Sequence, residues 1–393
     1  MKILFLVHEF PPCGGGAGRT AFHLAEELRN AGQEIVVLTC RYRNYHPESL
    51  PGIRIHTVWG SRKNETENRI IPTFLSFLVL GFIKGILIVR KEQISLVHAC
   101  MSVPAGILAW IISLGSGVPY IVSLLGSDVP HHTRNRVVIL LKPLIRRSWK
   151  RAARVIAQSQ GTRLTASLTY PGAVESFGVI YSGVNRRFRR IAERESRPPQ
   201  PRGIVRIVTL GRLIPLKGVH DVLDALALLK AAEKIGEFVF TVIGTGPKLG
   251  ELKIQADRKG IGSFVRFRGF IGTEEIVTEF NNSDFFIITS YSESMGMVFV
   301  EALACGLPLI GSNVGGIPEI IDADVGLLVE SGNVPAIADA ILEMSRSCHS
   351  YDKEKLAVRA SQFSWKNISG SYLKVYTQVA GISTENPYAA IHG

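Results

Sequence analysis

The stretch Asp284–Gly306, DFFIITSYSESMGMVFVEALACG, carries the most informative pattern in this chain. The apolar run Phe285–Thr289 predicts a buried parallel strand, and Met297–Cys305 predicts a helix that ends at Gly306. A short polar loop lies between them. In an open α/β sheet, such a loop lies at the carboxyl end of its strand, where ligands bind, and the amide groups that open the next helix attract anions. The stretch therefore predicts a ligand site on a Rossmann-like sheet.

Two carboxylates frame this junction. Glu293 lies in the loop and Glu301 lies about one turn into the helix, with seven residues between them. On a continuous helix, eight steps of roughly 100° would leave them about 80° apart. The better interpretation is a loop acid and a helix acid that flank one ligand. The alternative is a solvated loop acid and an acid on the helix surface.

Strand and helix patterns alternate on both sides of this stretch. The predicted strands are Ile3–Val7, Glu34–Thr39, Ile53–Val58, Leu96–Ala99, Tyr120–Leu124 and Val155–Ala157, then Val205–Leu210, Phe238–Ile243, Val265–Phe267, Phe285–Thr289, Pro308–Gly311 and Gly326–Val329. Predicted helices in the first half are Arg19–Ala31, Thr73–Arg90 and Ala105–Leu114. This alternation predicts an α/β fold with two Rossmann-like, doubly wound domains that face a central cleft.

A segment rich in proline and charge, residues 186–203, predicts the linker between these domains. We therefore expect an N-terminal domain at 1–185 and a C-terminal domain at 204–364. Residues 365–393 are expected to form a closing helix, Trp365–Val379, and a loose tail.

Residues 70–89, IIPTFLSFLVLGFIKGILIV, are close to the length that spans a membrane and contain Gly81-x-x-x-Gly85. Pro72 and Lys84 argue against a span. A span would also place Leu96–Ala99 across a bilayer from the first strand, although both strands should share one sheet. We therefore predict a helix packed on the sheet, which could expose one face to lipid.

Composition limits the class of protein. Of the 393 residues, 46% are hydrophobic and 20% are charged, as expected for a folded protein of two domains. The five cysteines form no CxxC pair, which indicates reduced thiols and neither a disulfide framework nor a zinc site. The opening MKILFLVHEF is too short for the core of a signal peptide, so we expect a cytoplasmic protein.

The charge is unevenly distributed. Residues 1–200 contain 27 Lys and Arg against 12 Asp and Glu, whereas residues 201–393 contain 18 against 21. Within the basic half, Arg134–Arg154 has no acid and eight basic residues: Arg134, Arg136, Lys142, Arg146, Arg147, Lys150, Arg151 and Arg154. Apolar residues are interleaved with them, as in an interfacial amphipathic element. We expect this half to lie on an anionic membrane, peripherally at its inner face; the alternative is a solvated basic helix whose apolar residues face the core.

A glycine-rich loop, Pro11–Gly18 (PPCGGGAG), follows the first predicted strand and precedes a helix. Because glycines carry no Cβ, the backbone here could approach a phosphate or a sugar at a helix N-terminus. A plain glycine turn is the alternative. The spacing is not G-x-G-x-x-G, and Thr39 and Cys40 stand where a dinucleotide-binding fold has an acid after its second strand.

Three loops of the second half follow strands in a similar way. Gly211–Gly218 (GRLIPLKG) carries the two cations Arg212 and Lys217, and the other two loops are Gly244–Pro247 (GTGP) and Gly315–Glu319 (GGIPE). Arg212 can grip phosphate oxygens as a planar fork, and Lys217 can act as a point charge. Together the loops predict an anion site at one edge of the second sheet.

These motifs carry a family resemblance. Residues 205–330 resemble the donor-binding domain of the retaining, GT-B-fold glycosyltransferases of family 4 (glycosyl transferases group 1), with G-R-L…K-G, G-x-G, E-x7-E and G-G-x-P-E. The first half is similar through PPCGGGAG, LVHA at 96–99, VSLLGSD at 122–128 and IYSGVN at 180–185.

The resemblance implies a role for each matching residue. Arg212 and Lys217 would hold the donor diphosphate, Glu293 would contact the transferred sugar, and Glu301 would bond the ribose hydroxyls. Further donor contacts are implied for Gly15, Gly16, Gly244, Met295, Gly296 and Met297, with Gly15 and Gly16 lining the cleft from the acceptor side. His8, His98 and Asp128 would be acceptor or sugar contacts, or else structural residues.

The chain departs from the family pattern at three positions. Leu125 stands where the family often has a histidine, Asn185 replaces a frequent aspartate, and Thr289 replaces a frequent proline. Asp322-Ala323-Asp324 matches the D-x-D of metal-dependent transferases formally, but its surroundings predict an exposed turn. We therefore expect neither a metal site nor a cofactor.

The resemblance implies a hexosyltransferase-type enzyme that moves a sugar from a UDP- or GDP-sugar to an acceptor hydroxyl, with retention. The acceptor expected is a lipid-linked or cell-surface glycan precursor, and no nucleic acid is involved. Two other hypotheses stay open at this point: a dinucleotide-dependent oxidoreductase built on PPCGGGAG, and a non-catalytic membrane-surface binding module.

Overall fold

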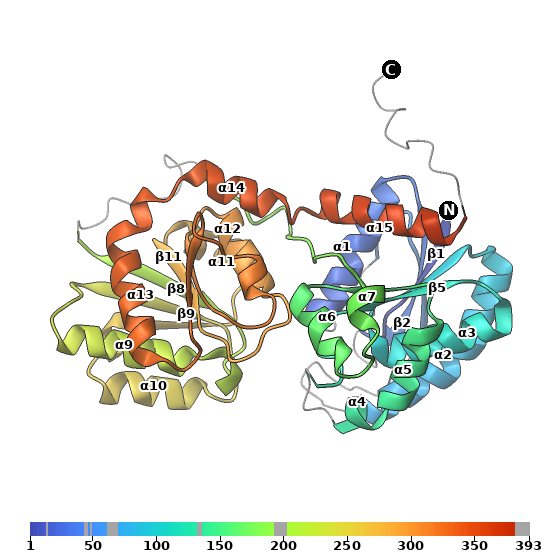
Figure 1. Cartoon of the computed structure of the whole chain (residues 1–393), viewed down its shortest axis with the longest axis horizontal. Coiled ribbons are helices and arrows are strands. Elements are labelled where there is room, and N and C mark those ends of the chain that lie inside the picture. The colour runs from blue at the N-terminus through green and yellow to red at the C-terminus, as the bar shows by residue number, and fades with distance from the viewer. Residues whose placement is uncertain are drawn as a thin grey trace, which may run out of the picture. The chain divides into compact units, whose positions relative to one another are not determined.

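The computed structural model describes residues 1–12, 15–42, 46–47, 49–60, 70–131, 136–191 and 203–381. These residues form two α/β units, each built around its own parallel sheet (Figure 1). The first unit comprises Met1–Gly183 together with the segment that starts at Trp365, and the second comprises Val184–Ser364. Two Rossmann-like domains were predicted and are confirmed. Most of the predicted linker and tail, 192–202 and 382–393, lies outside the described residues.

The first sheet has seven strands in the order β3-β2-β1-β4-β5-β6-β7. They are β1 (Lys2–Leu6), β2 (Glu34–Arg41), β3 (Arg54–Trp59), β4 (Leu96–Ala99), β5 (Tyr120–Leu124), β6 (Arg154–Ala157) and β7 (Gly178–Val179). The chain order reverses between β1 and β4, which pair in parallel. The glycine-rich loop after β1 therefore lies at a topological switch point, where open α/β sheets bind ligands.

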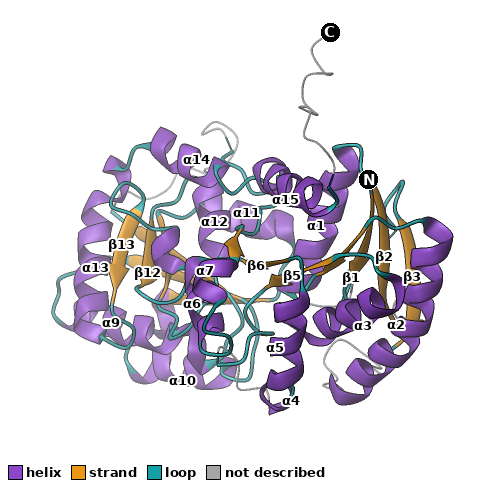
Figure 2. Cartoon of the chain, turned by 45° about the vertical axis from the view of Figure 1, so that its right-hand side comes forward, coloured by secondary structure: helices purple, strands orange, loops and turns teal. Residues whose placement is uncertain are grey.

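Helices cover both faces of this sheet because side chains alternate along its strands. Leu4 and Leu6 of β1 belong to one core cluster, and Ile3 and Phe5 belong to the other. The first face is covered by α2 (Ile70–Glu92), α3 (Ile107–Ser116) and α5 (Lys142–Arg151), and the second by α1 (Gly16–Asn30) and α15 (Trp365–Val379). Figure 2 shows α5, α3 and α2 as neighbours on the first face.

Helix α2 contains the apolar segment 70–89, and it packs on the sheet as predicted. A Cβ on Gly81 would lie 2.8 Å from Leu108 of α3, and one on Gly85 would lie 2.4 Å from Ile112. Lys84 Nζ donates to the carbonyl of Thr57 in β3 at 2.8 Å. The two glycines therefore bring α2 close to its neighbour α3 within one chain.

The second sheet has six strands in the order β10-β9-β8-β11-β12-β13. They are β8 (Val205–Leu210), β9 (Phe238–Ile243), β10 (Val265–Gly269), β11 (Phe285–Ile288), β12 (Leu309–Ser312) and β13 (Gly326–Val329). Its helices are α9 (Val219–Ala231), α10 (Leu249–Arg258), α11 (Thr273–Asn281), α12 (Met297–Ala304), α13 (Val334–Ser347) and α14 (Lys353–Ser361). The order reverses between β8 and β11, so the loops after these two strands flank the switch point of this sheet.

The predicted closing helix has the bounds Trp365–Val379 and belongs to the first unit, although it follows the second unit in sequence. It packs beside α1 with Ile368, Tyr372 and Tyr376 buried. The first unit is thus made from both ends of the chain.

Candidate active site

The loop between β11 and α12 has the two parts that its sequence predicts. Glu293 lies in the loop, and Glu301 is the fifth residue of α12. The strand ends at Ile288 and the helix begins at Met297, each within a residue of its predicted bound. The two acids of E-x7-E therefore do not share one helix, which confirms the prediction of a loop acid and a helix acid.

Neighbouring loops at the carboxyl edge of the sheet pack closely against one another at glycine residues. Gly218 has a φ of +66°, and a Cβ there would lie 2.1 Å from the carbonyl oxygen of Thr289. Gly315 has a φ of +56°, and a Cβ there would lie 1.6 Å from the carbonyl oxygen of Glu293. Only glycine allows both the backbone conformation and the close approach. The backbone of Glu293 is thereby fixed by the loop after β12, and the turn that carries Lys217 is fixed by the end of β11.

Thr289, which stands where the family often has proline, also joins these loops. Its buried hydroxyl donates to the carbonyl of Gly218 at 3.0 Å. Proline has no hydroxyl and could not make this bond. The sequence marked the position as a departure but gave no signal of this contact, because the residues are 71 positions apart.

Lys217 and Glu293 form an ion pair at this edge. Their side chains are 20% and 15% exposed, so the pair is partly shielded from water and still open to a ligand. A lysine ammonium has three donors and a carboxylate has about four acceptor sites. Both groups can therefore keep their mutual contact and accept a further partner each.

The remaining predicted donor contacts of the second unit also follow strands of the second sheet. Gly296 caps α12, and Met297 opens it. Arg212 is exposed and is the second residue after β8. Gly244, directly after β9, approaches Gly211 so closely that a Cβ on Gly244 would lie 2.0 Å from the carbonyl oxygen of Gly211. The structure thus brings cations, a carboxylate and a helix N-terminus to one edge of the sheet, an arrangement suited to a diphosphate.

Met295 is the exception among these residues, because its side chain is buried. The donor contact implied for the backbone of Met295 stays a prediction. Glu301 is half-buried on α12, one turn past the N-terminus of the helix.

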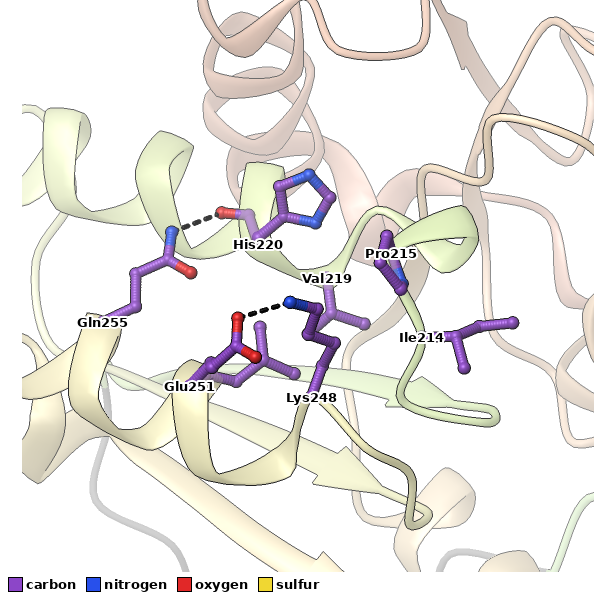
Figure 3. Close-up of a pocket in the computed structure, with 8 residues that line it drawn as sticks. Ile214, Pro215, Val219, His220, Lys248, Glu251 and Gln255 are labelled. Carbon is purple, nitrogen blue, oxygen red and sulfur yellow. Dashed lines mark hydrogen bonds and ion pairs between the residues drawn. The ribbon is translucent and has the colours of Figure 1, made fainter.

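An open pocket of about 320 Å³ lies between the N-terminal turns of α9 and α10 (Figure 3). It is lined by Ile214, Pro215, Val219, His220, Lys248, Glu251, Leu252 and Gln255. Lys248 Nζ contacts Glu251 Oε2 at 2.5 Å, and Gln255 Nε2 donates to the carbonyl of His220 at 2.9 Å. Ile214 and Pro215 belong to the same loop as Lys217. The pocket was not predicted from the sequence: Ile214 and Pro215 belong to the predicted Gly211–Gly218 loop, but the other lining residues belong to no motif.

His98 lies inside the first unit and not at its surface. The side chain is fully buried in β4, where its Nε2 lies 2.7 Å from Ser123 Oγ and its Nδ1 lies 2.7 Å from the hydroxyl of Tyr376. Ser123 Oγ is also 3.0 Å from the hydroxyl of Tyr372. Burial lowers the pKa of His98 from 6.5 to about 3, so the ring is neutral at physiological pH. This geometry favours a structural role, in which His98 anchors α15 to the sheet.

Asp128 and His8 are also buried. Asp128 accepts from the backbone amides of Ser102 at 2.5 Å and Leu125 at 2.9 Å, and burial raises the pKa of its carboxyl group. Asp128 thereby ties its own turn to the segment after β4. His8 follows β1 and packs edge-on against Phe74 of α2, with ring centroids 5.1 Å apart.

Gly15 and Gly16 are exposed and lack the close backbone contacts of Gly218 and Gly244. Gly15 caps α1, which begins at Gly16, and a Cβ on either residue would meet nothing within 4 Å. Internal packing therefore does not require glycine here, which leaves ligand access as a reason for it. The helix begins three residues before its predicted start, so both glycines belong to its N-terminus.

The two acids of the D-x-D sequence lie in an exposed turn, as predicted. Asp324 pairs with Lys355 at 2.7 Å, and Asp322 pairs with Arg359 at 3.6 Å. Both basic partners belong to α14. The turn thus has a structural explanation within the second unit.

Comparisons with known proteins agree with the fold and with the loops. Residues 193–358 match the family model "Glycosyl transferases group 1", and residues 15–170 match the model "Glycosyl transferase 4-like domain". Glycogen synthase of Mycobacterium tuberculosis is 25% identical over 404 residues, covering 96% of this chain and 94% of that protein.

Two solved structures show the same fold over nearly the whole chain. Sucrose-phosphate synthase from Thermosynechococcus elongatus is similar with a TM-score of 0.80 at 20% identity, covering 97% of this chain and all of that one. Anabaena HepE in complex with UDP-glucose is similar with a TM-score of 0.72 at 21% identity, covering 96% of this chain and all of that one.

The two parallel-sheet domains and the two matching family models define a glycosyltransferase of the GT-B fold. The chain belongs to the glycosyl transferases of group 1 and is a transferase of the hexosyltransferase type. This finding excludes the oxidoreductase and the non-catalytic binding module.

Proposed function

We propose that this enzyme transfers a hexosyl unit from a nucleotide-diphosphate sugar to an acceptor hydroxyl and retains the anomeric configuration of the donor. The observation that carries the proposal is the ion pair of Lys217 and Glu293 beside the N-terminus of α12. A cation, a carboxylate and a row of helix amides are the groups that a charged diphosphate and a polyhydroxyl sugar need.

In the proposed reaction, Arg212 and Lys217 hold the diphosphate and stabilise the negative charge that it gains as its bond to the sugar C1 breaks. Glu293 accepts hydrogen bonds from hydroxyl groups of the transferred sugar and so positions it. Glu301 accepts hydrogen bonds from the hydroxyl groups of the ribose. The acceptor oxygen attacks C1 on the face that the diphosphate leaves. The acceptor proton passes to the departing diphosphate, so no nucleophile from the protein is required. We propose further that no dedicated metal ion takes part.

Similarity to HepE in its UDP-glucose complex makes UDP-sugars the first donors to test. For the acceptor, we propose a lipid-linked or cell-surface glycan precursor at the inner face of a membrane. The support for this setting is the basic first half of the chain, with exposed Arg146, Arg147, Lys150 and Arg151 on α5.

A thermal-shift screen of UDP-, GDP- and ADP-sugars tests the donor. A ligand at 100 times its dissociation constant adds about 2.7 kcal/mol to the free energy of unfolding. Proton NMR of the first product formed from the best donor should then show the anomeric configuration of that donor. A product of inverted configuration, or a folded protein that no sugar nucleotide stabilises, would overturn the proposal.

A further inference from the structure

The outer face of α2 is apolar from Leu75 to Leu87. Leu75, Val79, Ile83 and Leu87 recur every four residues and are 51–60% exposed. Over twelve residues of helix they form a stripe about 18 Å long, which we call the α2 stripe. Its exposure is notable because the opposite side of α2 is buried: Phe77 and Ile88 lie in the core, and Gly81 and Gly85 lie against α3.

Exposed apolar side chains continue onto neighbouring helices of the same layer. Leu114 lies in the last turn of α3 and is 68% exposed, and Leu144 is exposed in the first turn of α5. Ile139 and Leu140 of the short helix α4 (Arg136–Leu140) are exposed as well. Figure 2 shows these helices on one side of the first sheet. Large exposed apolar side chains on four helices of one layer are unusual for a monomeric soluble protein.

The charge of this layer has one sign. Between residues 70 and 174 the sequence contains only two carboxylates, Glu92 and Asp128. Glu92 has a 15% exposed side chain paired with Arg54 at 2.5 Å, and Asp128 is buried against backbone amides. The exposed charges on the described parts of α2 and α5 are therefore basic: Arg90, Lys91, Arg146, Arg147, Lys150 and Arg151.

A transmembrane span does not fit these contacts. The sheet side of α2 carries Lys84, whose Nζ bonds the carbonyl of Thr57, and two glycines fitted against α3. A bilayer around the helix would require these contacts to break. Only one face of α2 is available, which is the geometry of a helix that lies in the membrane interface.

We propose that the layer formed by α2, α3 and α5 is the surface through which the enzyme lies on an anionic lipid bilayer, with the α2 stripe inserted among the lipids. The basic groups of α5 and of the end of α2 then contact lipid phosphates. This inference rests on the proposed membrane setting of the acceptor and adds the part of the surface that enters the lipid. Insertion of apolar side chains gives an attachment that salt weakens but does not abolish, whereas attraction between charges alone is screened by salt.

Vesicle flotation of the full chain tests this, with phosphatidylcholine vesicles that contain or lack phosphatidylglycerol, at low and high salt. The variant Val79→Ser/Ile83→Ser/Leu87→Ser removes most of the α2 stripe at positions that already face water, so the fold should persist. We expect its partition onto anionic vesicles at high salt to fall at least about tenfold, because each inserted aliphatic side chain contributes on that scale.

The matched control is Leu228→Ser/Ile254→Ser/Val358→Ser, which changes three apolar residues of similar exposure on the second unit. This variant should float like the parent. Melting temperature and stabilisation by a sugar nucleotide, measured on both variants, separate lipid binding from donor binding. Unchanged flotation of the stripe variant, or a dimer of the parent that the stripe variant converts to a monomer, would overturn the proposal. A parent that floats normally but is stabilised by no sugar nucleotide would count against the proposed function alone.

Discussion

The buried His98 makes a prediction that separates a structural role from the sugar contact implied by the family resemblance. Replacing His98 by Gln removes a ring that bonds Tyr376 through Nδ1 and Ser123 through Nε2, each at 2.7 Å. A glutamine amide cannot reach both partners in the same geometry, so at least one buried hydroxyl loses its bond. Such a loss costs about 1–3 kcal/mol. At roughly 2–4 °C per kcal/mol for a unit of this size, the melting temperature should fall by roughly 2–12 °C.

The pH dependence of stability provides a second readout. Burial holds the folded pKa of His98 at about 3, against 6.5 in the unfolded chain. Between these two values only the unfolded chain binds the proton, so this contribution to stability is complete above about pH 6.5 and is lost as pH falls. The loss is about 1.4 kcal/mol per pH unit, or roughly 2 kcal/mol at pH 5. Glutamine does not take up a proton in this pH range. Between neutral pH and pH 5, the free energy of unfolding of His98→Gln should therefore fall by roughly 2 kcal/mol less than that of the parent.

Thermal and urea unfolding followed by circular dichroism at about pH 7.5 and about pH 5 measures both effects. The control is His349→Gln, which changes an exposed histidine and should alter neither quantity. Donor affinity of the His98 variant, measured by calorimetry where the protein is folded, should equal that of the parent. A variant with unchanged stability and pH dependence but strongly reduced transfer would refute the structural role and support a sugar contact.

Four further predictions concern the proposed site and surface. Glu301→Ala should weaken nucleotide binding by roughly 1.5–3 kcal/mol, the value of a hydrogen bond to a charged group, and calorimetry on the folded variant checks this. Arg212→Ala and Lys217→Ala should each lower kcat/KM at least about 10²-fold, because each variant lacks a positive charge that stabilises the leaving diphosphate. Steady-state rates near those of the parent would contradict the assignment. Chelation by EDTA should leave the rate within about twofold, and a loss that Mg²⁺ or Mn²⁺ restores would show that a metal takes part. Reversing Arg146, Arg147, Lys150 and Arg151 to Glu should reduce flotation on anionic vesicles at low salt and change little on neutral ones; each basic residue near such a surface contributes about 1 kcal/mol.

Much of the fold could be predicted from the sequence because its strands are short, buried and strongly apolar. The bounds of β4, β5, β8, β9 and β13 are those predicted. Strand β7 was missed, since two residues carry no pattern. Helix α1 was predicted to start too late, because its first turn consists of glycine and alanine and lacks the apolar periodicity on which the prediction relied.

The site was predictable where its residues follow strands in sequence, and less so where it depends on contacts between distant residues. Lys217 and Glu293 were each marked by a motif, but no motif shows that they pair across 76 positions. The bond from Thr289 to Gly218 and the contacts of Tyr372 and Tyr376 with the first sheet depend equally on tertiary structure. His98 illustrates the resulting ambiguity, since its sequence motif is the same whether the ring faces a ligand or the core.

The position of α15 has a consequence for the synthesis of the chain. The ribosome releases the residues of α15 only after the second unit has been made, so the unit that begins first is completed last. Until then the apolar side chains of α1 and β1 that pack against α15 are exposed to water, and His98 lacks its hydrogen bond with the hydroxyl of Tyr376. A nascent chain that stops before Trp365 should therefore have a protease-resistant second unit and a protease-sensitive first one, the reverse of the usual order in which domains fold on the ribosome.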